Sequence, residues 1–573
     1  IIGIIITFIL ILISLVWRLA TSEVGSGYYG AALDDTNASW YQKAVLKEYR
    51  HLKPPKRRIP YSEFCYPQKF KIQPQQKLIG DFMRPQGKLH EDSLLVIHKI
   101  GAGKTCLSIQ VGMQWRRRGK PLYVMPASLI PGFRAELRSQ CAGDDYITAA
   151  ERERLKSLDP GSAEYKSIIA ESDARIDRDF IVMSYNKFAA AVHAGSYKKV
   201  AAPILIVDEL QNINSQGGKY YSAVKKWVEH FDTAPIVLMS ATPLFDSAEE
   251  IDGIATLMRL KSSGDKTVIT PDDIRTLFAG RVSYFEGADP ITFPDVTVRV
   301  KKCKMSQHQA KWYRAQVEAE MKKTGEVKIR DVAESFYIKS RQKSNIVYPK
   351  GLTGQAGMNL LTDSVIRSSL DTYSAKYSAL VKKLLRSHGP ESLSFVYTSF
   401  TGAGGIAVLK KILNAVGYKD YLTDGPGKRR YVVWSGEETL QEKQIIRDVF
   451  NSRENDDASK IQVVIGSPAI KEGVTLTRVR TVHLLESYWN FSHLDQIMGR
   501  AIRYCSHKTL TSKDRSVVVY IYAAIAGDVS KEPKPEESID LYMMDIADKK
   551  RDAIAPYMEA FADVAVDKLV HYP

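Results

Sequence analysis

The segment 98–105 reads HKIGAGKT and follows a short apolar run. In a turn of this kind, backbone N–H groups and the start of the next helix point at phosphate, Lys104 reaches the β and γ oxygens, and the Thr105 hydroxyl ligates magnesium. His98 takes the place of the first glycine of the GxxxxGKT pattern, but the two glycines that follow keep the backbone permissive. The segment therefore predicts a phosphate-binding loop. Its expected nucleotide-binding residues are His98, Lys99, Ile100, Gly101, Ala102, Gly103, Lys104 and Thr105.

A pair of acidic residues directly follows a second apolar run, 204–207. Asp208 would hold magnesium through water, and Glu209 would orient and deprotonate the water that attacks the γ-phosphate. By itself, an acidic pair at the end of a strand is more often a solvated turn or a helix cap. Together with the phosphate loop it predicts a hydrolytic site with ATP and Mg²⁺ as cofactors, in which Thr105 and Asp208 face the metal.

A glutamine upstream of the loop is a candidate for base recognition. Gln76 lies in the segment IQPQQ. A side-chain amide can read adenine because it donates one hydrogen bond and accepts another. We therefore expect Gln76 to contact the base, with Gln73 and Gln75 as neighbouring alternatives.

Two further pairs of residues are candidates for coupling hydrolysis to movement. Ser240 and Thr242 follow the apolar run 236–239, so their hydroxyl groups could bond the acidic pair and carry the effect of hydrolysis to a nucleic-acid-binding face. The alternative interpretation is a helix cap. Glu472 and Gly473 follow a later strand pattern and are assigned to the same coupling role.

The segment 496–503 reads QIMGRAIR and supplies a distant second group of polar side chains. Arg500 and Arg503 are spaced three apart, so on a helix they would share one face. Arginines delivered from a second lobe complete a nucleotide site only when the cleft closes, which predicts arginine fingers on the γ-phosphate and a motor function. Gln496 is expected to contact the nucleotide or its water. The alternative is a surface salt-bridge pair.

Short apolar runs alternate with helical patterns from residue 68 onward. The runs are 94–97, 122–125, 204–207, 236–239, 394–397, 461–465, 482–485 and 517–522. Such alternation predicts α/β lobes with mostly parallel sheets flanked by helices. A charged insert, 143–178, is interpreted as a solvated excursion. In the less regular piece that precedes the second series, Arg341, Lys343 and Lys350 are candidates for phosphate contacts.

The expected organisation has six parts. They are a transmembrane anchor at 1–20, a linker at 21–67, an ATP-binding lobe at 68–260, a linker with inserted helices at 261–373, a second lobe at 374–530 and a helical extension at 531–573. The anchor is predicted because residues 1–16 are almost wholly apolar and end at Trp17 and Arg18, an interfacial pair. A cleaved signal peptide and a buried helix are the alternatives.

The net charge indicates the class of partner, and the cysteine spacing indicates whether a zinc site or a disulfide framework is expected. The 573 residues carry a formal net charge of +16. This excess favours a polyanionic partner, with nucleic acid first, and an anionic membrane face or a merely basic surface as alternatives. The five cysteines are scattered without CxxC spacing. They indicate neither a zinc site nor a disulfide framework, so reduced thiols are expected.

The order of the motifs resembles a known series. The segments IQPQQ, HKIGAGKT, PASLI, DELQ, SATP, VYTSF, GSPAIKEGVTL and QIMGRAIR resemble the motifs of superfamily 2 helicases and translocases. More narrowly, DELQN, SATPLFDSAEEI, FPDV with MSQHQAKWY, and YWNFSHLDQIMGRAIRYCSH resemble poxvirus nucleoside triphosphate phosphohydrolase I and the early transcription factor small subunit, with their relatives in large DNA viruses. The resemblance covers residues 65–567 and does not include the apolar start.

This resemblance implies two RecA-like lobes that close on Mg-ATP. It implies DNA-dependent ATP hydrolysis that is carried in the virion and used in early transcription, with the motif residues above in their assigned roles. Gln211 stands where DExH members have histidine and is assigned to coupling between the lobes. The expected function is translocation along nucleic acid, DNA before RNA, with or without unwinding. Expected partners are viral transcription machinery and a membrane, in the virion and host cytoplasm.

Two rival hypotheses belong to other classes. One is a membrane-tethered virion structural or docking protein with a vestigial ATPase core. The other is a nucleotide-binding signalling switch, which the second lobe disfavours.

Overall fold

The structure is a computed structural model of the whole chain. It describes residues 39–53, 60–67, 69–87, 89, 92–99, 101–213, 217–245, 247–261, 268–324, 336–386, 393–471 and 474–571. The expected anchor, together with Ile100, Glu472 and Gly473, lies outside these residues. Among the residues described, no helix has the length and apolar character needed to cross a membrane.

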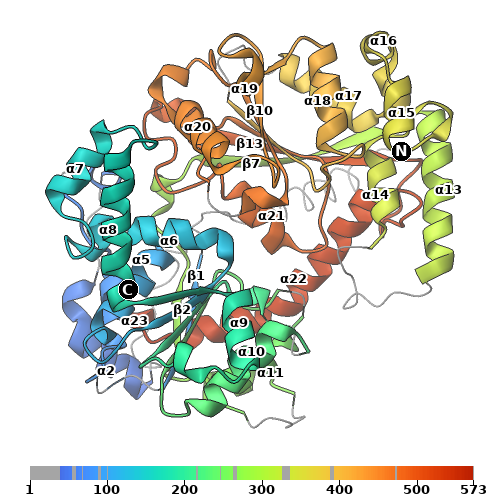
Figure 1. Cartoon of the computed structure of the whole chain (residues 1–573). Coiled ribbons are helices and arrows are strands. Elements are labelled where there is room, and N and C mark those ends of the chain that lie inside the picture. The colour runs from blue at the N-terminus through green and yellow to red at the C-terminus, as the bar shows by residue number, and fades with distance from the viewer. Residues whose placement is uncertain are drawn as a thin grey trace. The chain divides into compact units, whose positions relative to one another are not determined.

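The described chain divides into two compact units. The first lobe comprises the described residues up to Ala288 together with those from Asp552 onward, and the second lobe comprises Asp289–Arg551. Helix α22 (Ile539–Asp563) therefore has residues in both lobes. Each lobe contains one parallel sheet covered by helices (Figure 1).

The first lobe holds a six-stranded parallel sheet in the order β3-β2-β4-β5-β1-β6. Its strands are β1 (Ser93–His98), β2 (Leu122–Met125), β3 (Ile181–Ser184), β4 (Leu205–Asp208), β5 (Ile236–Ser240) and β6 (Val282–Phe285). Because β1, β4 and β5 are neighbours, the residues that follow their carboxyl ends meet at one edge of the sheet. These are the phosphate loop, the acidic pair and the Ser240 segment.

Both faces of this sheet are buried, which explains why its strands are apolar runs without alternation. Leu94 and Val96 of β1 pack on one side with α4 and α5, and Leu95 and Ile97 pack on the other with α9, α10 and α11. The helices of the lobe are α2 (Trp40–Tyr49), α3 (Tyr61–Cys65), α4 (Pro74–Phe82), α5 (Lys104–Trp115), α6 (Ile130–Leu137), α7 (Ala149–Ser157), α8 (Ala163–Asp179), α9 (Tyr185–His193), α10 (Lys219–His230), α11 (Glu250–Leu257), α12 (Pro271–Leu277) and α23 (Lys568–His571).

The charged insert is more firmly attached than a solvated excursion would be. Tyr146 and Ile176 are fully buried in the core beneath α5. On its surface, Arg134 of α6 forms ion pairs with two aspartates of α8. The insert therefore combines a small apolar anchor with a charged outer face. The interpretation as a solvated excursion holds for α7 and most of α8, but not for Tyr146 and Ile176.

The second lobe holds a seven-stranded parallel sheet in the order β7-β13-β12-β8-β11-β10-β9. Its strands are β7 (Asp295–Lys304), β8 (Ser394–Tyr397), β9 (Lys419–Asp420), β10 (Arg430–Trp434), β11 (Val463–Gly466), β12 (Thr481–Leu484) and β13 (Ser516–Ile525). One face packs against α17 and α18, and the other against α20, α21 and the start of α22. The helices are α13 (Gln307–Thr324), α14 (Ile338–Asn345), α15 (Gly354–Leu360), α16 (Asp363–Tyr373), α17 (Ala375–Arg386), α18 (Ile406–Ala415), α19 (Tyr421–Asp424), α20 (Leu440–Asn451) and α21 (Phe491–Met498).

The α/β class with two parallel sheets is confirmed, and each of the eight apolar runs contains a strand. Five strands were not predicted: β3, β6, β7, β9 and β10. For β7, an edge strand, the reason is that its residues alternate between exposed and half-buried positions over most of its length and carry four basic side chains. Such an edge strand has no continuous apolar run, and charge on an edge also discourages pairing with another chain.

Candidate functional site

The phosphate loop joins β1 to α5, and its shape depends on two left-handed glycines. Gly101 has φ +85° and Gly103 has φ +78°, a backbone region that residues with a Cβ rarely adopt. α5 begins at Lys104 directly after Gly103, so its first N–H groups are directed toward the loop. The ammonium group of Lys104 donates to the carbonyl of His98 over 3.0 Å. The predicted strand, loop and helix are therefore in place.

Two glutamines of α4 hold this loop from outside. The Gln75 amide donates to the carbonyl of Ala102 over 3.2 Å, and the Gln76 amide donates to the carbonyl of Gly103 over 3.1 Å. A Cβ at Gly103 would lie 2.2 Å from the amide nitrogen of Gln76, so a side chain there would displace this amide from its bond to the loop. Because the Gln76 oxygen also accepts from the Gln73 N–H, reading adenine requires these bonds to exchange, and that role stays a prediction.

The acidic pair lies at the end of β4. Burial, and next the charge of Glu209, raise the pKa of the Asp208 carboxyl above its usual range, while the charge of Lys104 lowers it. A carboxylate in this position gains from a nearby cation, so Asp208 together with the hydroxyl of Thr105 fits the oxygen-rich donor set that a magnesium ion requires.

Glu209 is held in an unusual backbone conformation. Its φ is +58° and its ψ is +55°, the left-handed region, which costs free energy for a residue with a Cβ. Tyr185 donates from its hydroxyl to the carbonyl of Asp208 and, over 3.1 Å, to that of Glu209. These contacts hold the turn that presents the Glu209 carboxylate, and no local sequence pattern marked Tyr185 for this role.

A continuous chain of hydrogen bonds connects Glu209 to the segment after β5. The Gln211 amide donates to the Glu209 carboxylate over 2.6 Å, and its oxygen accepts from the Ser240 hydroxyl over 2.6 Å. The Ser240 oxygen in turn accepts from the Thr242 N–H over 2.9 Å. The structure thus brings together Glu209, Gln211, Ser240 and Thr242, and the hydroxyl that bonds toward the acidic pair is that of Ser240.

Gln496, Arg500 and Arg503 belong to the second lobe. α21 ends at Met498, so Gln496 lies on the helix but the two arginines follow it in a tight turn. The prediction that they share one helix face is therefore wrong. The physical reason is that the N–H of Arg503 donates to the Ser506 hydroxyl, and not to the carbonyl of Gly499 as it would in a helix, while the carbonyl of Arg500 accepts from the Leu476 N–H.

The Arg503 guanidinium is fixed by two hydrogen bonds. It donates to the carbonyl of Gly499 over 2.8 Å and to the hydroxyl of Thr475 over 2.7 Å. Burial, and next the charge of Arg500, lower the pKa of Arg503 to about 9. At neutral pH it is therefore still a cation, held in one orientation, as a finger on phosphate needs to be.

The second lobe contains a buried polar network that the sequence did not predict. Glu486, which follows β12, accepts from the Thr398 hydroxyl over 2.8 Å and from the Ser399 N–H over 2.7 Å. Lys376, which is fully buried, donates to Asp540 over 2.7 Å and to the carbonyl of Leu485 over 2.7 Å. Glu486 could have been identified from the sequence, because it is an acidic residue that follows an apolar run. No sequence pattern marked Lys376 on α17 for this network.

The basic residues proposed for phosphate contact do not all suit that role. Arg341 is 4% exposed, and its guanidinium lies over the rings of Phe400, Tyr488 and Trp489. It is a cation–π centre of the core, and the prediction of a surface phosphate contact is wrong for Arg341.

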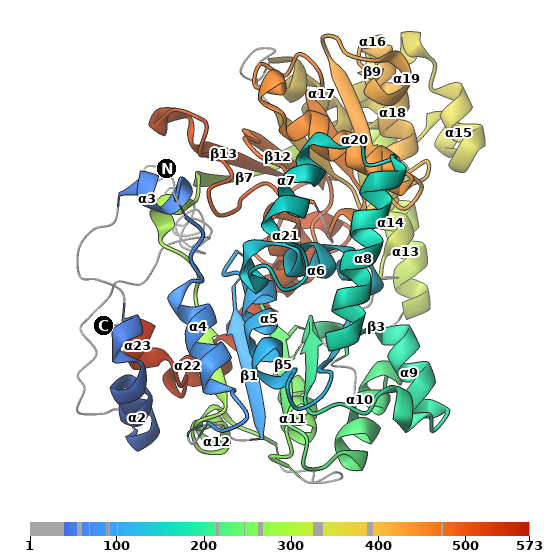
Figure 2. The ribbon, with the colours of Figure 1, turned by 60° about the vertical axis from the view of Figure 1, so that its left-hand side comes forward.

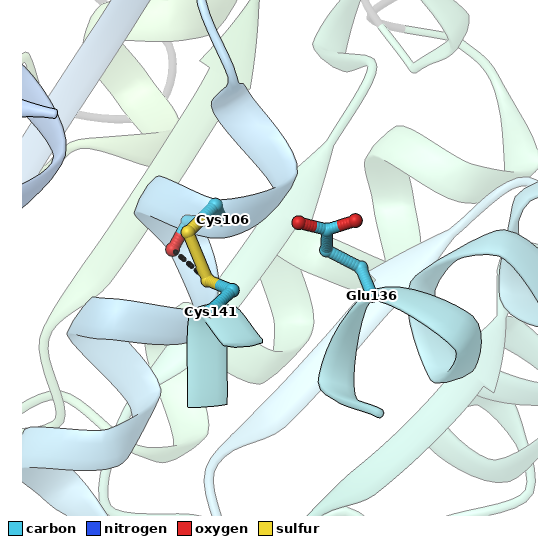
Figure 3. A group of neighbouring side chains, drawn as sticks. All are labelled: Cys106, Glu136 and Cys141. Atoms are coloured by element: carbon cyan, nitrogen blue, oxygen red, sulfur yellow. Dashed lines mark hydrogen bonds between the residues drawn. A yellow bond between two sulfur atoms is a disulfide. The ribbon is translucent and has the colours of Figure 1, made fainter. Parts of the chain in front are cut away.

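A disulfide lies next to the phosphate loop. Cys106 of α5 is bonded to Cys141, and the Cys141 sulfur lies 3.5 Å from the carbonyl oxygen of Cys106 (Figure 3). Glu136 projects toward the pair, and burial raises the pKa of its carboxyl. The two cysteines are 35 residues apart but their Cα atoms are 5.8 Å apart, because α5 packs on the turn that holds Cys141. The expectation of reduced thiols is wrong for this pair.

Two domain families match the chain on either side of the division between the lobes. Residues 41–245 match the type III restriction enzyme res subunit, and residues 375–505 match the helicase conserved C-terminal domain. A putative ATP-dependent RNA helicase of Acanthamoeba polyphaga mimivirus is 37% identical over 539 residues, which span 89% of this chain and 91% of that relative. The chain belongs to helicase superfamily 2. It is therefore an ATP-hydrolysing enzyme of the helicase type.

A more distant relative of this helicase is also a viral protein. The early transcription factor 70 kDa subunit of Vaccinia virus (strain Ankara) is 23% identical over segments that cover 77% of this chain and 70% of that subunit. A solved structure, the Sulfolobus solfataricus SWI2/SNF2 ATPase core in complex with dsDNA, covers 87% of this chain and 96% of that chain at 17% identity, with a TM-score of 0.30. The predicted membership in superfamily 2, with relatives in large DNA viruses, is confirmed by the family matches and the viral relatives.

Proposed function

We propose that this helicase couples ATP hydrolysis to movement along DNA during viral transcription, with or without strand separation. One observation carries the proposal: the hydrogen-bonded chain from the Glu209 carboxylate through Gln211 and Ser240 to the backbone of Thr242. Hydrolysis of ATP beside Glu209 changes the charge next to this hydrogen-bonded chain. The segment after β5 that contains Ser240 and Thr242 therefore responds to the state of the nucleotide. A scaffold without ATPase activity has no need for this connection.

The residues of the first lobe divide the hydrolytic work. Loop N–H groups and Lys104 would bind the phosphates, Asp208 and Thr105 would hold a magnesium ion, and Glu209 would orient and deprotonate the attacking water. The ion would supply positive charge against the phosphate oxygens. From the second lobe, Arg503 would stabilise the charge that develops on the γ-phosphate.

Three observations support movement along nucleic acid and a role in transcription. The formal net charge of +16 favours a polyanion, and binding should weaken steeply with salt. One relative is named as an early transcription factor subunit and another as an RNA helicase, so DNA and RNA both need testing. We choose DNA because the wider resemblance is to DNA-virus transcription proteins.

The decisive experiment measures the ATPase rate with no nucleic acid, single-stranded DNA, duplex DNA and RNA. Stimulation by DNA above RNA is expected, and equal rates in all four conditions would contradict the proposal. Lys104→Ala and Glu209→Gln should abolish stimulated hydrolysis while the protein stays folded. Lys120→Ala is the matched control, because Lys120 is an exposed lysine of the same lobe that bonds the carbonyl of Asp177.

Location is a separate proposal that rests on the apolar residues 1–16. We propose that they attach the helicase to a membrane in the virion or host cytoplasm. Deleting residues 1–20 should move the protein from the membrane fraction to the soluble fraction without loss of ATPase activity. Unchanged partitioning would refute the anchor and leave the ATPase proposal intact.

A further inference from the structure

The outer edge of the first-lobe sheet is covered by a segment from far along the chain, 564–571, which we call the return segment. The N–H of Val566 donates to the carbonyl of Val282 over 2.8 Å, and the N–H of Tyr284 donates to the Asp567 carboxylate over 3.1 Å. The edge strand β6 thus bonds β1 on one side and the return segment on the other. This completes a sheet edge that would otherwise present unpaired backbone groups.

The return segment is itself held by the N-terminal helix α2. The Gln42 amide donates to the carbonyls of Asp563 and Ala565 over 2.9 and 3.0 Å, and the Tyr41 hydroxyl donates to that of Val564 over 2.7 Å. α2 and α23 lie side by side in both views (Figures 1 and 2). The position of Asp567 is therefore fixed from two directions.

A buried side-chain relay runs from the return segment to the phosphate loop. The Ser283 hydroxyl donates to Asp567 over 2.7 Å, and the Ser283 oxygen lies 2.8 Å from Nε2 of His98. All three side chains are fully buried. Because Ser283 gives its proton to the carboxylate, its oxygen accepts from His98, which places the imidazole hydrogen on Nε2.

The charges around the relay agree with a neutral imidazole. Burial, and next the charges of Lys104 and His571, lower the pKa of His98 well below its usual range. Burial also raises the pKa of Asp567, against which the bonds from Ser283 and the Tyr284 N–H act. A neutral His98 is therefore oriented by hydrogen bonding, and not by an ion pair.

His98 is the first residue of the phosphate loop. Two other contacts connect the position of His98 to the residues that are expected to bind the nucleotide. Its carbonyl accepts from the Lys104 ammonium over 3.0 Å. The N–H of the next residue, Lys99, donates to the carbonyl of Phe285 on β6 over 3.0 Å. The entry to the loop is thus attached to β6 by the backbone of Lys99 and by the ring of His98.

We propose that Ser283 and Asp567 are positioning residues for the phosphate loop, which act through His98 to hold the loop entry in the shape that binds ATP. This assigns a use to the histidine that replaces the first glycine of the loop pattern. It also gives the return segment a part in nucleotide binding. The inference rests on the proposed ATPase site but not on translocation.

The matched test compares two buried serines on neighbouring strands of the same sheet. Ser283→Ala removes the link to His98. Ser93→Ala removes a comparable bond, from Ser93 to the carbonyl of Met258 over 3.1 Å, at the amino end of β1. Both variants should lower the melting temperature, Ser283→Ala by more, because it removes the bond to Asp567 as well as the bond to His98. Only Ser283→Ala should raise the KM for ATP, by about tenfold with kcat within about twofold, since the loss of one buried hydrogen bond to a positioned group is of this order.

A direct binding measurement separates this inference from the proposed function. Titration with a fluorescent ATP analogue, without nucleic acid, should show the same rise in Kd for Ser283→Ala and Asp567→Ala, and no further rise in the double variant. Asp567→Asn keeps an acceptor for the Tyr284 N–H, and its amide NH2 can donate to the Ser283 oxygen, so that Ser283 donates to Nε2 of His98 instead. Because the ring stays linked to residue 567, this variant should recover most of the affinity. Equal Kd values for wild type and Ser283→Ala, or equal losses in Ser283→Ala and Ser93→Ala, would overturn the inference. Missing DNA stimulation with these Kd differences intact would overturn only the proposed function.

Discussion

The side-chain amide of Gln211 donates a hydrogen bond to the Glu209 carboxylate, with 2.6 Å between Nε2 and Oε2. The other end of the same amide accepts from Ser240. A glutamine can make both contacts at once, because its amide carries a donor and an acceptor. Gln211, which stands where the DExH pattern has histidine, therefore connects Glu209 to Ser240.

Gln211→Ala should uncouple hydrolysis from nucleic acid. We expect the DNA-stimulated kcat to fall about tenfold, since a hydrogen bond to a charged group contributes roughly 1.5 kcal/mol, while the Kd for ATP stays within about twofold. Ser240→Ala should give the same loss, and the double variant no more than either one. Asn212→Ala is the control, because Asn212 bonds the carbonyl of Glu209 and not its carboxylate. A Gln211→Ala enzyme with full stimulation would remove the coupling role.

Arg503→Ala should reduce hydrolysis far more than nucleotide binding. An arginine finger acts on charge that develops in the transition state, so we expect kcat to fall by about a thousandfold with little change in Kd for ATP. Rapid-quench measurement of single-turnover hydrolysis tests this. Arg480→Ala serves as control, because Arg480 belongs to the same lobe and forms an ion pair with Asp514. If ATP binding alone were lost in Arg503→Ala, the finger assignment would be wrong.

Asp567 should make the stability of the protein depend on pH. Burial raises its pKa from 3.8 to about 6 in the folded protein. A carboxyl with a raised pKa stabilises the fold below its unfolded pKa, and this contribution is lost as pH rises through about 6. Between about pH 5 and pH 7, the free energy of unfolding of wild type should therefore fall relative to Asp567→Asn by roughly 1 kcal/mol.

Denaturant unfolding at several pH values measures this difference. Asp563→Asn is the control, because the contribution of Asp563 to the free energy of unfolding should change with pH in the opposite direction. Burial raises the pKa of Asp563, but hydrogen bonds from Arg275 and Lys568 outweigh it and lower the pKa overall. The contribution of Asp563 is present above its unfolded pKa and is lost as pH falls. Parallel pH profiles for wild type and Asp567→Asn would contradict the pKa increase that burial gives the Asp567 carboxyl.

The disulfide between Cys106 and Cys141 should stabilise the first lobe. It closes a loop over a sequence separation of 35 residues. Chain-entropy arguments give such a cross-link about 2–4 kcal/mol. Cys141→Ser should therefore lower the melting temperature of the oxidised protein and reduce the further loss that dithiothreitol causes. Cys303→Ser is the control, since Cys303 is a free, buried thiol. Mass spectrometry of peptides from unreduced protein would detect the bond directly, and its absence there would contradict the structure at this point.

Lys376 and Asp540 form a fully buried ion pair that joins α17 to the start of α22. Lys376→Met should destabilise the second lobe by about 3–5 kcal/mol, because it leaves the Asp540 charge buried without its cation. The double variant Lys376→Met with Asp540→Leu should recover much of this loss. Urea unfolding measures both. A double variant as unstable as the single one would show that packing, and not the unpaired charge, sets the cost.

Much of the site was readable from the sequence because its chemistry is carried by contiguous residues. Lys104 and Thr105 follow their glycines directly, and Asp208 with Glu209 directly follows an apolar strand, so element order alone placed them at one sheet edge. The same logic identified eight strands as uninterrupted apolar runs. It failed for β7, which alternates as an edge strand does, and for Arg500 and Arg503, where the helix ends at Met498 before either arginine.

The sequence by itself therefore determined the phosphate loop, the acidic pair and the α/β class. Only the tertiary structure decided which distant residues serve them. Ser283 lies 185 residues from His98 and 284 residues from Asp567, yet the three side chains form one buried relay. Such contacts depend on which strands are neighbours and on what covers the sheet edge, and neither periodicity nor residue type encodes them locally.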